Sequence, residues 1–139
     1  MLKNIPKILT PDLLKILMEM GHGDEIVISD GNFPAASHAQ HLVRMDGHGG
    51  AQVLDAVLEL FPLDTYATPV YLMEKVPGDD VETPIWNTYQ AIIEKHQPSP
   101  IQHLERFAFY ERAKKAYAIV ATGESALYAN LILKKGVVK

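Results

Sequence analysis

Two polar residues flank one short apolar run near the N-terminus: His22 and Asp30 of the segment EMGHGDEIVISD. Histidine is the one side chain whose unperturbed pKa lets it both donate and accept protons near neutrality. An aspartate carboxylate can accept hydrogen bonds from two hydroxyl groups, which suits a polyol ligand. The two residues therefore predict a pocket that binds hydroxyl groups and contains one titratable histidine.

Each of these residues also has a purely structural explanation. Asp30 follows an apolar run, and aspartate after a strand often caps a turn. His22 follows an expected helix end, where the helix dipole stabilises a partly positive imidazole. The glycines on both sides of His22 favour a functional role, because they let a ligand approach the backbone closely.

Two further polar segments are candidates for the same pocket. Arg106 has a guanidinium that can bind two neighbouring oxygens of a diol or a carboxylate, although an ion pair with Asp30 or a nearby glutamate explains it equally well. The segment TGESALYAN supplies the Tyr128 hydroxyl and the Asn130 amide, each of which can instead tie down its own loop. The aromatic residues of FAFYER, which include Tyr110, are expected to pack in the core or an interface.

The remaining histidines offer a rival, metal-binding interpretation. His38, His41 and His48 fall in a glycine-rich region, but their spacing matches no helical pair and no known ligand signature, so no metal is expected. His96 and His103 are expected to face solvent. The chain has no glycine-rich phosphate loop and no Gly-x-Ser-x-Gly motif, so no nucleotide or other cofactor is expected.

Composition excludes several classes of protein. The 139 residues are expected to form one domain, 1–139. The chain has no cysteine, which removes disulfides, zinc–thiolate sites and cysteine nucleophiles and fits a reducing, cytoplasmic compartment. A net charge of −4, with no basic cluster beyond Lys134-Lys135, argues against a nucleic-acid partner. No apolar stretch approaches the ~20 residues of a membrane span, so no membrane partner is expected.

Helical and strand patterns alternate along the chain. Helices are expected over residues 11–20, 51–61, 84–93 and 107–116. Strands are expected at 26–29, 41–45, 70–76, 101–106, 117–123 and 129–138, and a loop is expected at 30–37.

This alternation predicts an α/β fold with three layers, α/β/α, around a mainly parallel, mixed central sheet. The last two strands are separated only by ESALY and are alternatively antiparallel neighbours. In open α/β sheets ligands bind beyond the carboxyl ends of the strands, which is where Asp30 and Arg106 are expected to lie.

The polar segments, in this order, resemble the ribose pyranase / L-fucose mutarotase family over nearly the whole chain. The resemblance rests on the Gly-His-Gly-Asp box at 21–24, the apolar strand that ends in Asp30, and the closing Thr-Gly-Glu and Tyr-x-Asn motifs. Phe33-Pro34 and RFAFYERA are similar to the fucose branch rather than the ribose branch. The chain departs from many fucose-type members, which often have a histidine in the Phe-Pro loop where Asn32 and Ala36 stand here.

The resemblance implies a ribose-pyranase-like fold and a mutarotase that interconverts the α and β anomers of L-fucose by acid/base ring opening, without a cofactor. It implies ring-shaped homo-oligomers whose pockets are completed by a neighbouring subunit. The alternatives are a ribose-type pyranase and a noncatalytic sugar-binding or transport accessory protein. By matching position, the resemblance implies His22 as the proton donor and, as sugar contacts, Asp30, Arg106, Tyr128, Ala129 and Asn130.

The distance between His22 and Asp30 is difficult to reconcile with one small ligand. Eight residues in one straight strand would separate them by ~27 Å, at ~3.3 Å per residue. That is too far for both to contact one monosaccharide. Either the GDE segment folds back, or the two residues of one pocket come from neighbouring subunits.

Overall fold

The computed structural model describes residues Met1–Lys139 as one sheet covered by helices. The helices are α1 (Pro11–Glu19), α2 (Ala35–His38), α3 (Gly50–Leu58), α4 (Pro84–His96) and α5 (Arg106–Lys115). The strands are β1 (Glu25–Ser29), β2 (Leu42–Met45), β3 (Val70–Met73), β4 (Ile101–Leu104), β5 (Ala118–Thr122) and β6 (Leu131–Lys134). Their order in the sheet is β2-β5-β1-β6-β3-β4.

One strand of this sheet, β6, is antiparallel. It lies between β1 and β3 and runs antiparallel to both, whereas the other neighbouring pairs are parallel. The prediction of a mainly parallel, mixed sheet is therefore confirmed. The alternative for the last two strands is wrong in part, because β1 separates β6 from β5. As a consequence of its direction, β6 begins at the edge of the sheet where β1 and β3 end.

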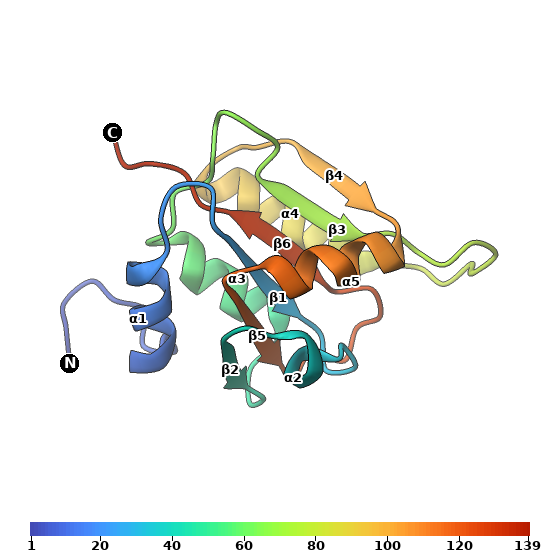
Figure 1. Ribbon diagram of the computed structural model, residues 1–139, viewed down its shortest axis with the longest axis horizontal. Helices are drawn as coiled ribbons and strands as arrows, with labels where there is room; N and C mark the ends of the chain where they lie inside the picture. The colour runs from blue at the N-terminus through green and yellow to red at the C-terminus, as the bar shows by residue number, and fades with distance from the viewer.

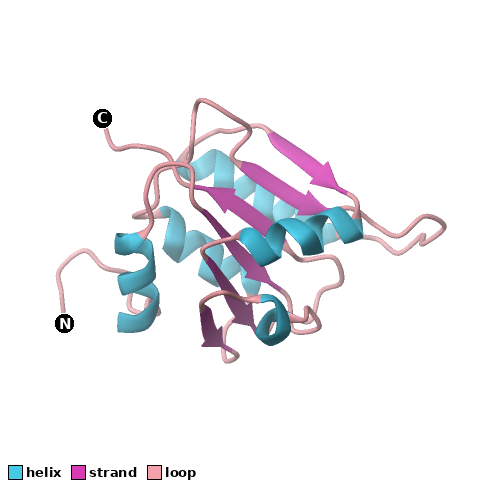
Figure 2. Cartoon of the chain, in the orientation of Figure 1, coloured by secondary structure: helices cyan, strands magenta, loops and turns pink.

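Helices cover both faces of the sheet, which confirms the predicted three layers. Figure 1 shows α5 in front of the sheet and α3 and α4 behind it, and Figure 2 shows the same layers by type of structure. The residues of α1 pack with those of α3 and α4, and those of α2 pack with α5. None of the five helices is long and apolar enough to cross a membrane.

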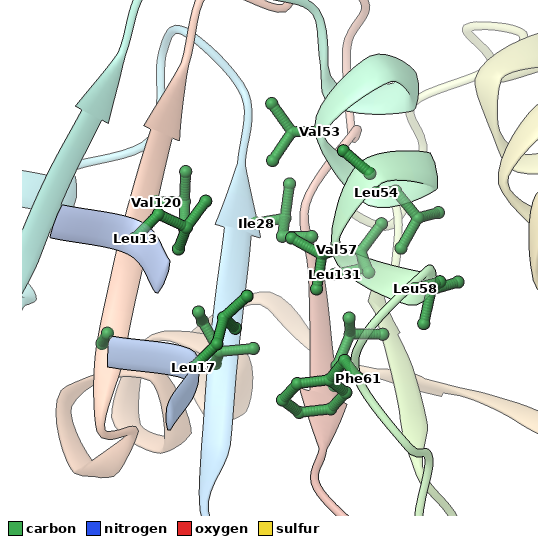
Figure 3. Close-up of a cluster of buried hydrophobic side chains, with 14 of the residues drawn as sticks. Leu13, Leu17, Ile28, Val53, Leu54, Val57, Leu58, Phe61, Val120 and Leu131 are labelled. Carbon is green, nitrogen blue, oxygen red and sulfur yellow. The ribbon is translucent and has the colours of Figure 1, made fainter. Parts of the chain in front are cut away.

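The central strands are buried on both faces, as their continuous apolar sequence predicts. In β1, Ile26 and Ile28 belong to the cluster with α1, α3 and α4, whereas Val27 belongs to the cluster with α5. Figure 3 shows Ile28 facing side chains of α1 and α3, including Leu17 and Val57. This packing holds β1 in place between the two helical layers.

Several expected boundaries are wrong. The strands expected at 70–76 and 129–138 span only Val70–Met73 and Leu131–Lys134. Residues 30–37 were expected to form only a loop, but Ala35–His38 form α2, a single turn that is too short to produce a periodic pattern. Arg106 was expected to end a strand, but it is the first residue of α5. The Glu105 carboxylate caps this helix by accepting a hydrogen bond from the N–H of Ala108 at 3.0 Å.

Gly123 lets two loops meet backbone to backbone just after β5. A Cβ atom there would overlap the carbonyl oxygen of Asp46, whereas a Cβ at Gly47 would meet nothing within 4 Å. The adjacent Glu124 holds the start of α3, because its carboxylate accepts a hydrogen bond from the N–H of Gly50 at 3.0 Å. The loop after β5 therefore tolerates little displacement.

Replacing Gly123 with alanine should destabilise the fold, because the added methyl group must displace backbone rather than a flexible side chain. The expected loss in the free energy of unfolding is about 1–3 kcal/mol, the usual cost of overpacking. Urea denaturation followed by circular dichroism measures this loss. Gly47→Ala is the matched control and should change the free energy by less than about 0.5 kcal/mol. Equal stability of the two variants would contradict the close approach.

Candidate functional site

A cavity of about 230 Å³ lies at the edge of the sheet where β1, β3 and β4 end and β6 begins. Ligands in open α/β sheets bind at this edge. Asp30 follows β1, Arg106 lies just beyond β4, and Asn130 immediately precedes β6. The cavity is lined by Asp30, Asn32, Phe33, Met73, Val76, Asp79, Arg106, Tyr110, Leu127, Tyr128 and Asn130.

Asp30 is the centre of the hydrogen bonds in this cavity and is only 6% exposed. One carboxylate oxygen accepts from the N–H of Asn32 at 3.0 Å. The other accepts from the N–H of Ala129 at 3.3 Å and from the side-chain amide of Asn130 at 3.1 Å. A carboxylate offers about four acceptor positions, so one remains for a ligand.

Burial raises the pKa of Asp30 above its ordinary value, and the hydrogen bonds from Asn32, Ala129 and Asn130 offset only part of this effect. The bond from Asn32 is the turn cap that the sequence offered as a structural explanation. This bond occupies only one of the two carboxylate oxygens. The other oxygen bonds Ala129 and Asn130, so Asp30 does more than cap the turn.

Ala129 supports the cavity from behind rather than lining it. The residue is fully buried, its N–H donates to Asp30, and its carbonyl accepts from the Tyr89 hydroxyl at 3.0 Å. Both backbone groups are therefore engaged within the chain. The structure brings Ala129 next to the other predicted sugar contacts, but it is not among the residues that line the cavity.

Arg106 enters the cavity from the first turn of α5. Its guanidinium carbon lies 4.5 Å from the ring centroid of Phe107, and its Nε is buried without a hydrogen-bond partner. Arg106 forms no ion pair with any carboxylate, so that explanation of the residue is wrong. A buried donor without a partner is costly, and a ligand oxygen would satisfy it.

Tyr128 lines the cavity beside the segment that follows β3. Its backbone lies in the left-handed region, with φ of 56°. Its hydroxyl donates to Asp79 Oδ2 at 2.6 Å and accepts from the N–H of Val76 at 3.2 Å. The Trp86 indole N–H donates to the Tyr128 carbonyl at 2.7 Å. The residue therefore ties down its own loop and also lines the cavity.

Aromatic rings form one wall of the cavity. Phe33 and Tyr110 have ring centroids 5.5 Å apart, and both line the cavity. Tyr110 packs against the core cluster that contains Phe109, as expected, and it also lines the cavity. Because α5 begins at Arg106, Tyr110 lies four residues later on the same helix face and points toward the same edge.

His22 lies at the opposite end of β1 from this cavity. Strand β1 pairs continuously with β5 and β6, and the N–H of Gly23 extends this ladder by donating to the carbonyl of Lys135 at 2.8 Å. The GDE segment therefore does not fold back, and that explanation of how His22 could reach Asp30 is wrong. The structure brings together the five predicted contacts, but not the predicted proton donor of the same chain.

An acidic partner accompanies His22 at that end. His22 Nε2 lies 3.1 Å from Asp64 Oδ1, with side chains 45% and 4% exposed respectively. Burial raises the pKa of Asp64, but hydrogen bonds from the N–H of Tyr66 and from His22 outweigh it and hold the pKa below its ordinary value. A buried carboxylate in this position fixes the orientation of the imidazole ring.

The other histidines are dispersed. The His96 side chain is only 12% exposed and lies 2.6 Å from Asp55, so the expectation that it faces solvent is wrong. His103 packs edge-on against Trp86, with ring centroids 4.7 Å apart. No group of three or more histidine, aspartate or glutamate side chains is arranged to hold a metal ion.

Comparison with known proteins identifies the family. Residues 3–138 match the model of the RbsD / FucU transport protein family. The chain belongs to this family. The fucose mutarotase of Bos taurus is 53% identical over 143 residues, which cover 98% of this chain and 94% of that protein.

Solved structures of the RbsD / FucU family share the fold. FucU from Bifidobacterium longum matches with a TM-score of 0.96 and 61% identity, covering 99% of this chain and 100% of that chain. A fucose mutarotase from Streptococcus pneumoniae, solved in complex with L-fucose, matches with a TM-score of 0.94 and 56% identity over 99% and 100% of the two chains. The predicted family and its fucose branch are thus confirmed.

Three residues of this site were not identified from the sequence. Asp64 contacts His22, Asp79 contacts Tyr128, and Tyr110 lines the cavity. Asp64 is 42 residues from His22, and Asp79 is 49 residues from Tyr128. No local pattern links either pair. Tyr110 could have been identified from the sequence if the helix had been started at Arg106, because the two residues are then four apart on one helix face.

The raised pKa of Asp30 predicts a pH dependence of stability. The folded chain retains a proton on this carboxyl at pH values where the unfolded chain has lost it. Stability contributed by Asp30 therefore falls as pH rises from the ordinary pKa of 3.8 through the raised value, and is constant above it. Asp30→Asn removes the titration, so the wild-type minus variant difference in unfolding free energy should decline with pH over this window.

Urea denaturation at a series of pH values, from about 3 to 7, measures the two curves. Asp80→Asn, at an exposed carboxyl, is the matched control and should give a flat difference. A wild-type minus Asp30→Asn difference that rises with pH would mean that the hydrogen bonds, rather than burial, dominate the pKa of Asp30.

Proposed function

We infer that this protein is an L-fucose mutarotase, an isomerase that interconverts the α and β anomers of the sugar by acid/base chemistry. The conclusion rests on the cavity lined by Asp30, Arg106 and Asn130. It is supported by the similarity of the whole chain to a fucose mutarotase solved in complex with L-fucose. A cytoplasmic location stays a prediction from composition.

The lining of the cavity suits this sugar in two respects. The remaining acceptor positions of the Asp30 carboxylate and of Asn130 Oδ1, together with the buried Arg106 Nε–H, provide polar contacts for neighbouring hydroxyl groups. Met73 and Val76 add apolar surface in the same cavity. L-Fucose carries a methyl group in addition to its hydroxyls, so a lining of both kinds favours it over ribose, which has no methyl group.

Interconversion of the anomers requires opening of the ring at the bond between C1 and O5. A proton must reach O5 and a proton must leave the anomeric hydroxyl, and closure on the other face reverses both transfers. A general acid and base with pKa values near neutrality contribute roughly 10²–10⁴-fold to such a step. We assign the donation to O5 to His22, with Asp64 orienting its ring, and the transfer of the anomeric proton to a water molecule. Asp30 and Arg106 hold the sugar.

This assignment requires a neighbouring subunit, because His22 lies at the far end of β1 from the cavity of its own chain. We propose a homo-oligomer in which His22 of one subunit enters the cavity of the next. Apolar side chains near the cavity support such a contact, since Phe107 is 60% exposed and Leu127 is 50% exposed. Contact with a second copy would cover this apolar surface.

The activity is tested by proton NMR saturation transfer between the α and β anomeric signals of L-fucose. The wild-type protein should accelerate exchange, and His22→Ala should reduce the acceleration by roughly 10²–10⁴-fold, the contribution of general acid–base catalysis. His41→Ala, at an exposed histidine packed against Tyr117, is the matched control and should retain full activity.

The same NMR series on D-ribose separates the alternatives. Acceleration on ribose alone would assign the protein to the pyranase branch. Saturable binding of L-fucose without faster exchange would indicate a noncatalytic sugar-binding protein. Full activity of His22→Ala would remove this histidine from the chemistry.

Subunit complementation tests the shared pocket. His22→Ala and Asp30→Asn are each expected to be inactive as homo-oligomers. In mixed oligomers of equal composition, about a quarter of the pockets should combine an intact His22 with an intact Asp30 from the neighbour, if subunits assort at random. NMR exchange measurements on co-expressed chains should therefore show partial recovery. Mixed oligomers, verified by native mass spectrometry, that recover no activity would contradict the shared pocket.

A further inference from the structure

The carboxylate of Asp79 contacts the Tyr128 hydroxyl at the rim of the cavity. The hydroxyl donates to Asp79 Oδ2 at 2.6 Å and accepts from the N–H of Val76 at 3.2 Å. Nothing in the chemistry described above assigns a role to Asp79, although it lines the cavity. It comes from the segment between β3 and α4, which Figure 1 shows projecting beyond the sheet.

The hydrogen-bonding capacity of a phenol limits what Tyr128 can do. A tyrosine hydroxyl has one proton to donate and can accept two hydrogen bonds. Here the proton is donated to Asp79 and one acceptor position is used by Val76. The remaining position can only accept. Toward a sugar, Tyr128 is therefore an acceptor for one hydroxyl, as long as Asp79 holds its proton.

Asp79 is itself fixed by the turn that carries it. Its Oδ1 accepts from the N–H of Val81 at 3.1 Å, and its own N–H donates to the carbonyl of Val76 at 3.0 Å. Gly78 has φ of +89°, a conformation that L side chains rarely adopt, and it allows the chain to turn here. The Lys75 ammonium donates to the Val81 carbonyl at 3.0 Å and closes the segment. The carboxylate is thus presented to Tyr128 by a closed turn.

The protonation states agree with this geometry. The hydrogen bond from Tyr128 lowers the pKa of Asp79, and the same bond raises the pKa of the Tyr128 hydroxyl. Near neutral pH the pair is therefore a carboxylate and a neutral phenol. Such charge-assisted hydrogen bonds are stronger than bonds between neutral groups.

We propose that Asp79 is a positioning residue, which holds the Tyr128 hydroxyl as a hydrogen-bond acceptor for one hydroxyl of the bound sugar. This inference rests on the proposed function of the cavity. It assigns the segment between β3 and α4 a part in binding, and it separates Tyr128 from the proton transfer: a phenol whose proton is held by a carboxylate neither donates that proton to O5 nor ionises readily.

The test is a double-mutant cycle of Asp79→Asn and Tyr128→Phe. Asparagine retains an acceptor for the N–H of Val81, so the turn can form, but it presents an NH₂ group where Tyr128 donates. Each single variant should raise the Kd and KM for L-fucose about fivefold to tenfold, as expected for one hydrogen bond, and leave kcat within about twofold. In the Tyr128→Phe background, Asp79→Asn should have less than about a twofold further effect.

Isothermal titration calorimetry gives the Kd, and NMR saturation transfer gives KM and kcat. Asp80→Asn, in the same turn but outside the cavity lining, is the matched control and should leave all three unchanged. Circular dichroism and thermal denaturation verify the fold of every variant.

Three outcomes would overturn the inference. Additive effects in the cycle would mean that Asp79 binds the sugar directly. An unchanged Kd in Asp79→Asn would limit Asp79 to a structural role in its turn, and a selective loss of kcat would place the pair in the proton transfer. If the wild-type protein binds L-fucose without accelerating exchange, only the proposed function is overturned. The double-mutant cycle still tests the role of Asp79, because the Kd values do not depend on activity.

Discussion

The reciprocal hydrogen bonds between Asp30 and Asn130, at 2.7 and 3.1 Å, hold together the edge of the sheet on which the site is built. Other buried groups extend this junction. The Thr122 hydroxyl donates to the Ser29 carbonyl at 2.6 Å, and the N–H of Met73 donates to the Asn130 carbonyl at 3.2 Å. A buried polar group that loses its partner costs about 1–3 kcal/mol, so these bonds fix the ends of β1, β3, β5 and β6 as a unit.

The antiparallel direction of β6 makes this junction possible. A parallel last strand would place the residues before it at the opposite edge of the sheet, next to His22. Because β6 runs against β1 and β3, the loop at 128–130 meets Asp30 and Arg106 at their carboxyl-end edge. The direction of β6 thus makes the loop before it part of the cavity wall, through Leu127, Tyr128 and Asn130.

The sequence predicts where a candidate residue lies in the fold when a local rule applies to it. Asp30 ends a continuous apolar strand, so the rule that ligands bind beyond the carboxyl ends of strands places it at this edge. Asn130 falls inside the strand expected at 129–138, and its position before β6 is evident only in the structure. Asp64 and Asp79 follow no such rule, since each meets its partner only after the chain has crossed the sheet. The turn of α2 escapes prediction because four residues give no period to detect.

His22 and the cavity that contains Asp30 lie at opposite ends of β1, a buried strand at the centre of the sheet. Ile26, Val27 and Ile28 of β1 are completely buried and paired on both sides, so bending β1 to bring His22 to Asp30 would break the central ladder. Such an opening costs close to the full stability of the fold. Contact between two copies requires no such distortion, because it uses surfaces that are already formed. For a rigid sheet with a polar group at each end, assembly is therefore the less costly way to complete a pocket.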